Sequence, residues 1–213
     1  LNTPYAENSN TVYGKDAGSK MHAENVNNTF IGDAIASVGT MTSDATNNTA
    51  LGTAALSNIT AGYENTAIGV SSCLDLTTGD RNAALGRRSL YDVTDGNYNT
   101  SVGWHSGYNI TTGSDNICIG ALSQTSAVGT DNEIVIGREA TGLGANKAVI
   151  GNASCTDVYM SQDSGATVHC TSVTVKETTT PTALADHGKI YTKSDNKLYF
   201  QDGAGTEHEI QFV

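Results

Sequence analysis

One group of side chains in this sequence has the chemistry to recognise a ligand. It combines arginines with aromatic and imidazole rings: Arg87, Arg88, Tyr91, Trp104, His105 and Tyr108. Its tryptophan and its pair of adjacent arginines are each the only ones in the chain. Such groups on a surface of small residues suit contact with a carbohydrate or a protein. The alternative is that they fill the cleft between subunits of an oligomer, and the sequence leaves both readings open.

Catalytic and metal-binding patterns are weak by comparison. No serine stands in the Gly-x-Ser-x-Gly frame of a hydrolase nucleophile, and the five histidines fall in unrelated segments. Turns such as Thr77–Asp80 offer oxygen ligands to Ca²⁺, but aspartate is common in turns for its own hydrogen bonding, so we favour a solvated turn. We therefore expect no enzymatic activity, no cofactor and no bound metal.

The candidate cluster lies within a repeat that returns every 17 residues. Each copy is closed by the pattern Asn-x-x-apolar-Gly, as in Asn65-Thr66-Ala67-Ile68-Gly69. The asparagine column holds Asn48, Asn65, Asn82, Asn99 and Asn116, and the glycine column holds Gly52, Gly69, Gly86, Gly103, Gly120 and Gly137. Self-similarity at a fixed short period predicts a solenoid, and apolar columns that keep register argue against a disordered low-complexity segment.

Each unit should form a flattened coil. Alternation of apolar and small polar residues favours strands, and two glycines per unit mark two corners. We predict a parallel β-roll with two short strands and two turns per coil, stacked ~4.8 Å apart. Four asparagines at the shared interval should stack in one ladder, as side-chain amides do: Asn65, Asn82, Asn99 and Asn116.

The chain divides into four predicted parts of an all-β protein. Residues 1–31 give irregular amino-terminal coils or an attachment segment, and 32–155 the regular solenoid. Residues 156–185 give a thin stem, and 186–213 a small antiparallel meander with strands near 190–193, 197–201 and 207–212. One face of this meander is apolar and predicts a trimerisation tip with the core Ile190, Leu198, Phe200, Ile210 and Phe212.

Composition limits the partners. The formal charge is −11, which argues against nucleic acid or anionic lipid as a partner. No apolar run approaches the ~20 residues that a membrane helix needs, so we expect no membrane insertion. The four cysteines form no Cys-x-x-Cys motif and should be buried thiols, which suits a reducing cytoplasm.

The closing pentads resemble the left-handed parallel β-roll heads of trimeric autotransporter adhesins. They are also similar to the Asn-Thr-Ala-Ile/Leu-Gly repeats of bacteriophage tail-fibre and tail-spike proteins. The resemblance covers residues 10 to 160, and the segments Gly188–Lys193 and Asn196–Asp202 look like the end of a phage fibre. Adhesin heads mostly use shorter coils than 17 residues, which is a departure from that family.

The resemblance implies a structural virion protein: a tail-fibre or spike segment that forms a rigid trimeric rod and contributes to host recognition and adsorption. Its partners would be two more copies in a parallel homotrimer, other tail, baseplate or fibre proteins, and a host-surface glycan or protein. It would be assembled in the host cytoplasm and located on the virion. The alternatives are a bacterial cell-surface trimeric adhesin and, from the column Thr60, Thr77, Thr94 and Thr111, an ice-binding solenoid that lacks a second threonine row.

Overall fold

The computed structural model describes residues 9–155, 158, 189–195, 197–202 and 204–210. All regular structure in these residues is β, in two units that meet between Val158 and Tyr159. The first unit holds a nine-stranded sheet and the second a three-stranded sheet. Of the predicted stem, 156–185, only residue 158 is described.

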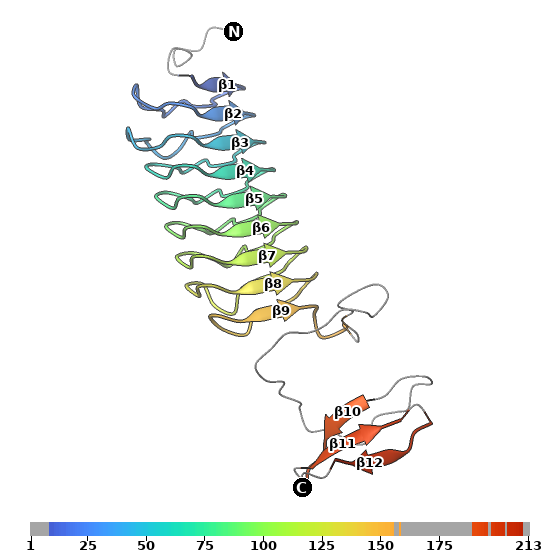
Figure 1. Ribbon diagram of the computed structural model, residues 1–213. Coiled ribbons are helices and arrows are strands. Elements are labelled where there is room, and N and C mark those ends of the chain that lie inside the picture. Colours follow the sequence, from blue (N-terminus) through green and yellow to red (C-terminus); the bar gives the residue numbers. More distant parts are fainter. Residues whose placement is uncertain (1–8, 156–157, 159–188, 196, 203, 211–213) are drawn as a thin grey trace. The chain divides into compact units, whose positions relative to one another are not determined.

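The first unit is a stack of coils, each contributing one three-residue strand (Figure 1). Neighbouring strands pair in parallel and in sequence order, so that Ala67 aligns with Ala50 on one side and Ala84 on the other. The strands are β1 (Thr11–Tyr13), β2 (Thr29–Ile31), β3 (Thr49–Leu51), β4 (Thr66–Ile68), β5 (Ala83–Leu85), β6 (Thr100–Val102), β7 (Ile117–Ile119), β8 (Ile134–Ile136) and β9 (Ala148–Ile150). The predicted parallel solenoid of about 17-residue coils is confirmed.

The prediction of two strands per coil is wrong, since the described coils contain one each. On the second side of the coil, the backbone N–H groups of Thr60, Ala61 and Gly62 all point to the carbonyl of Thr77, at 2.9, 3.1 and 3.2 Å. Three donors converging on one acceptor bend the chain into a turn and cannot make the regular ladder of a sheet.

Left-handed backbone conformations replace the second strand. In each regular coil, the residues two and four places after the closing glycine and the residue before the ladder asparagine have positive φ. In the coil after Gly86 these are Arg88, Leu90 and Tyr98, at 57°, 49° and 57°. The amide of each donates to a carbonyl of an adjacent coil, at 2.9–3.0 Å. These residues bear strain that glycine would avoid, and bonding along the rod axis offsets it.

The corner glycines are required by the close approach of successive coils. Gly86 has φ of +138°, and a Cβ there would lie 2.4 Å from the carbonyl oxygen of Gly103. Gly79 has no positive φ, but a Cβ there would lie 2.3 Å from the carbonyl oxygen of Gly96. One corner therefore excludes side chains by backbone conformation and by space, and the other by space alone.

A narrow core runs along the solenoid in three columns of buried side chains. The strand centres supply Ala50, Ala67, Ala84, Ser101, Cys118 and Val135, and the turns supply Leu56, Cys73 and Leu90, then Ile59, Leu76, Val93 and Ile110. Burial raises the pKa of the Cys73 and Cys118 thiols to about 12. These two are buried thiols as predicted, whereas Cys155 is exposed and Cys170 lies outside the described residues.

The second unit is an antiparallel meander of β10 (Lys189–Thr192), β11 (Leu198–Gln201) and β12 (Glu207–Glu209). The predicted antiparallel sheet is confirmed. Of the residues assigned to a trimer core, Ile190 and Phe200 are exposed. Leu198 and Ile210 are half-buried, and Phe212 lies outside the described residues.

The glycine corners can be tested by adding one methyl group. We expect Gly86→Ala to lower the free energy of unfolding by about 3 kcal/mol or more, because it combines a glycine-only φ with a clash against Gly103. Gly129→Ala is the matched control, since Gly129 is exposed and its new Cβ would meet only the Thr112 hydroxyl, at 3.1 Å. Denaturant unfolding of the two variants should separate them, and equal losses would contradict the proposed role of the corner.

Candidate functional site

The ladder asparagines are buried and join successive coils. Asn82 donates from its amide nitrogen Nδ2 to Asn65 Oδ1, at 3.1 Å, and to the carbonyl of Gly96 in the next coil, at 2.8 Å. Its Oδ1 accepts from the backbone N–H and from Nδ2 of Asn99, at 3.0 and 3.1 Å. One side chain thus bonds three coils. The pattern repeats at Asn48, Asn65, Asn82, Asn99 and Asn116.

The ladder ends at Glu133, which the sequence pattern had not assigned to this column. Glu133 is fully buried, and its backbone N–H donates to Asn116 Oδ1, at 2.9 Å. Its carboxylate accepts from the N–H and hydroxyl of Ser126, at 2.8 and 3.0 Å, and from the N–H of Gly144, at 2.6 Å. An asparagine would donate to the next coil, whereas Glu133 only accepts, so the column changes its chemistry where the repeat ends.

A second ladder runs beside the first in the opposite sense. Its side chains accept from the backbone N–H of the preceding coil: Asp80 from Tyr63, at 2.9 Å, and Asn97 from Asp80, at 2.7 Å. Ser114 and Asp131 continue the column. The Asp80 oxygen considered for Ca²⁺ is therefore engaged by a backbone donor. Within the described residues no group of three or more His, Cys, Asp or Glu side chains is placed to hold a metal ion.

The threonine column behind the ice-binding alternative also bonds within the rod. The hydroxyls of Thr60, Thr77 and Thr94 donate to the carbonyl of the threonine one coil on or its equivalent, at 3.0–3.3 Å. Hydroxyl donors used in this way do not project to an ice surface. The column is explained by coil-to-coil bonding.

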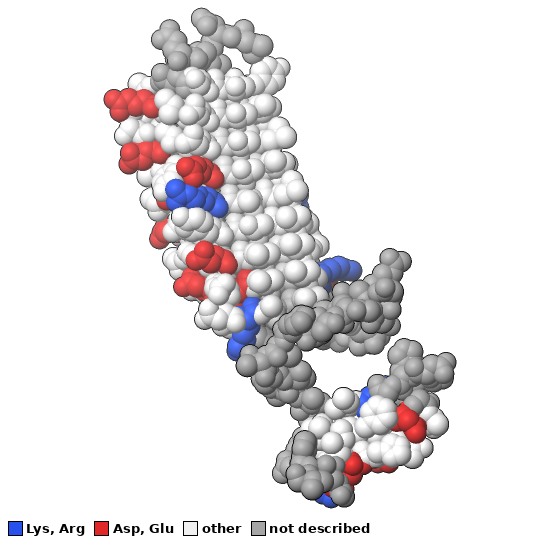
Figure 2. All heavy atoms as spheres, viewed as in Figure 1, with Lys and Arg blue, Asp and Glu red and all other residues white. Residues whose placement is uncertain are grey.

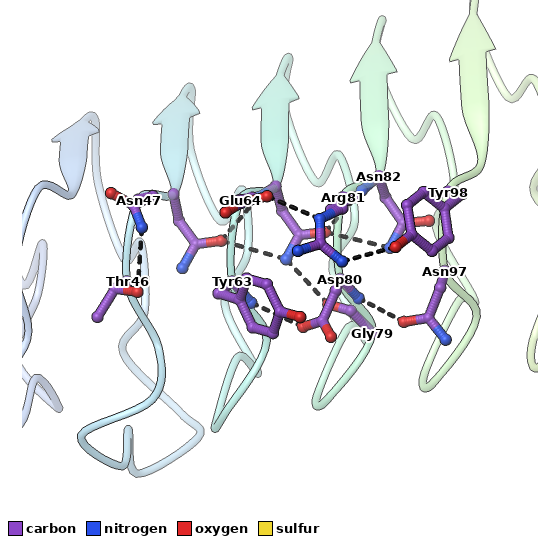
Figure 3. Close-up of polar contacts among 12 residues, drawn as sticks. Thr46, Asn47, Tyr63, Glu64, Gly79, Asp80, Arg81, Asn82, Asn97 and Tyr98 are labelled. Atoms are coloured by element: carbon purple, nitrogen blue, oxygen red, sulfur yellow. Dashed lines mark hydrogen bonds and ion pairs between the residues drawn. The ribbon is translucent and has the colours of Figure 1, made fainter.

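Arg81 forms a polar cluster on the turn edge that the sequence analysis missed (Figure 3). Its Nε donates to Glu64 at 2.7 Å and its Nη1 to the hydroxyl of Tyr98 at 2.6 Å. The guanidinium also lies over the rings of Tyr63 and Tyr98, at 4.8 and 5.3 Å from their centroids. The 17-residue spacing of Glu64, Arg81 and Tyr98 was the available signal. Because the guanidinium is already paired, this cluster reads as coil-to-coil support.

The predicted recognition residues come together in two successive coils. His105 is the centre: its ring lies 5.1 Å from that of Trp104, 5.2 Å from that of Tyr108 and 6.4 Å from that of Tyr91. Arg88 Nη1 lies 3.3 Å from His105 Nε2, and its guanidinium lies 5.3 Å from the Tyr91 ring centroid. In this single chain Arg87 and Trp104 are exposed, and Arg88, Tyr91, His105 and Tyr108 are half-buried.

The electrostatic environment of this cluster is positive. Burial lowers the pKa of His105, and the charges of Arg88 and Arg87 lower it further. The ring is therefore neutral at pH 7, which allows Nε2 to accept from Arg88. Burial raises the pKa of Asp92, and the neighbouring charge of Asp75 raises it further. Two arginines in a chain of net charge −11 thus favour an anion at this place.

The outward face of the parallel sheet is uncharged along its length. Beside the closing glycines runs an apolar stripe of one residue per coil, several of them exposed by a third to a half or more. The stripe consists of Tyr13, Ile31, Leu51, Ile68, Leu85, Val102, Ile119, Ile136 and Ile150. Figure 2 shows charged side chains gathered along the turn edge, with a broad charge-free surface beside them. An exposed apolar surface of this extent marks an interaction site.

No protein-family model, curated protein or solved structure matches this chain. In the part of the chain that the structure describes, no helix has the length and apolar composition of a membrane span.

The asparagine ladder can be compared with the ladder beside it. We expect Asn82→Ala to lower the free energy of unfolding by about 3 kcal/mol or more, because buried donors on Asn99 and the Gly96 carbonyl lose their partners. Asn97→Ala removes one half-buried acceptor and should cost about 1 kcal/mol. Chemical denaturation would measure both, and a larger loss for Asn97→Ala would show that the inner ladder is not the main tie between coils.

The lowered pKa of His105 predicts a loss of stability in acid. Because the folded-state pKa lies below the ordinary value of about 6.5, the unfolded chain binds the proton more readily, and stability falls as the pH falls through that value. Protonation also removes the acceptor that Arg88 uses. The thermal midpoint should therefore fall more between pH 7.5 and 5 for the native protein than for His105→Gln. Asp92, whose pKa is raised, is present in both proteins, so equal pH profiles would exclude the role of His105.

Proposed function

We propose that this protein is a segment of a bacteriophage tail fibre or spike: a rigid, parallel homotrimeric rod that carries a receptor-contact cluster for host adsorption. The observation that carries the proposal is the apolar stripe. It continues through all nine strands on a face that bears no charge, although charged side chains line the turn edge. Other tail, baseplate or fibre proteins would join its ends.

Self-association explains the stripe better than a small ligand does. Equivalent residues recur once per coil, so a second copy running parallel would meet the same row at the same spacing. Large exposed side chains such as Leu85 (50%) and Leu51 (47%) gain most from such coverage. Cyclic symmetry closes the assembly, and three chains fit the resemblance of the pentads to trimeric fibres and adhesins. The exposed Ile190 and Phe200 of the second unit make the same demand.

The receptor role rests on the cluster around His105. It lies just beyond the closing glycine, on the residues that follow the corner, whereas the stripe lies just before that glycine. An exposed tryptophan and an exposed arginine are typical of contact surfaces, where such side chains contribute most of the affinity. The ladders give the cluster a rigid support, since each coil is bonded to both of its neighbours.

Assembly is tested by placing a charge on the stripe. The native chain should have three times its 22.1 kDa mass in dilute solution, measured by native mass spectrometry or light scattering. Leu85→Lys should abolish the trimer, because each copy would bury an unpaired ammonium group. Thr78→Lys, at an exposed turn position, is the matched control and should still assemble. A compact native monomer of 22.1 kDa would refute the proposed rod.

Adsorption is tested separately on trimers that have assembled normally. Labelled native protein should bind to bacterial cells of the host, and Trp104→Ala should reduce that binding at least tenfold. Tyr98→Ala removes another exposed aromatic side chain one coil away and should leave binding within a factor of two. If both variants bind as the native trimer does, the cluster is not the receptor contact.

A further inference from the structure

We propose that Arg87 and Trp104 together form a subsite for an acidic sugar, with the indole against the sugar ring and the guanidinium on its carboxylate. This inference rests on the receptor role proposed above and adds the chemical class of the ligand.

Arg87 is the arginine of the solenoid that is available to a ligand. Arg81 is paired with Glu64, Arg138 with Glu139, and Arg88 bonds to His105. Within the described residues the exposed Arg87 guanidinium has neither an ion pair nor a hydrogen bond. A planar guanidinium binds a carboxylate through two parallel N–H bonds, which gives both strength and orientation.

Trp104 stands one coil from Arg87 in the same column. The backbone N–H of His105 donates to the carbonyl of Arg87, at 3.0 Å, which fixes the register of the two coils. Their side chains therefore leave the rod about 4.8 Å apart, a separation that one sugar ring and its carboxylate can span. Trp104 is 45% exposed and its ring rests against His105, so the indole is held while part of it stays open to solvent.

The surroundings favour an anion with an apolar face. The column continues with Val70 before Arg87 and Ala121 after Trp104, so neither neighbour along the rod carries a charge. Both Arg87 and Arg88 act on His105 in the direction of a positive potential. Asp92 is the acidic group that opposes them at His105, and its raised pKa reflects partial burial beside Asp75. A neutral sugar would use the indole and leave the Arg87 charge without a partner.

The test compares one sugar with and without its charge. The probes are an oligogalacturonate, its methyl ester, and a phosphorylated neutral oligosaccharide of the same length, each titrated into the assembled trimer by calorimetry. The oligogalacturonate should bind at least tenfold more tightly than the ester. Arg87→Gln should reduce its affinity to that of the ester, whereas Trp104→Ala should weaken both. Arg138→Gln, an exposed arginine of the same column, should change neither.

Each other outcome has a definite meaning. Equal affinity for the acid and the ester, or an acid preference that survives Arg87→Gln, would overturn the subsite. Equal binding of the phosphorylated sugar would replace carboxylate recognition by general anion binding. No binding of any probe by a trimer that still adsorbs to cells through Trp104 would overturn the acidic-sugar subsite but leave the receptor role. Loss of that Trp104-dependent adsorption would refute the receptor role itself.

Discussion

The hydrogen bonds that run along the rod axis are the constraint on which this solenoid depends. A coil of 17 residues with one three-residue strand cannot satisfy its backbone within itself, so its donors and acceptors must find partners in the coils above and below. The strands do this for three residues per coil. Around the rest of the coil, the asparagine ladder and the converging turn amides do it, and Asn82 alone contacts the coils of Asn65 and Asn99.

Several costly features follow from that constraint. Successive coils approach so closely that Gly79 and Gly86 have no room for a Cβ. Residues with ordinary side chains, such as Leu90 and Tyr98, take left-handed conformations because their amides then point along the axis. The core is correspondingly thin, with Ala84 at the strand centre and Leu90 in the turn. At the last regular coil Glu133 collects three donors and passes none on, which ends the ladder.

The same economy separates the surfaces of the rod. Polar and charged side chains are concentrated on the turn edge, where Arg81 and Glu64 bond between coils. The sheet face keeps apolar residues before each closing glycine, which suits burial against further copies. Arg87 and Trp104 follow the same glycines, so a recognition site is placed next to an assembly face without interrupting it. A rod that is rigid through its ladders is a suitable support for such a site, because the two coils that form it cannot move apart freely.

The sequence by itself determined the solenoid, its period and its columns, because side chains that stack on copies of themselves must recur at a fixed interval. It also determined that Asn65 and Asn82 share a row, and that Arg88 and His105 stand side by side. The tertiary structure alone decided that each coil has one strand and not two, since left-handed residues such as Leu90 carry no sequence mark. It also decided that Glu133, and not Asn132, continues the asparagine column. The physical reason is the same in both cases: backbone donors choose their acceptors by the three-dimensional course of the neighbouring coils, which the local pattern does not contain.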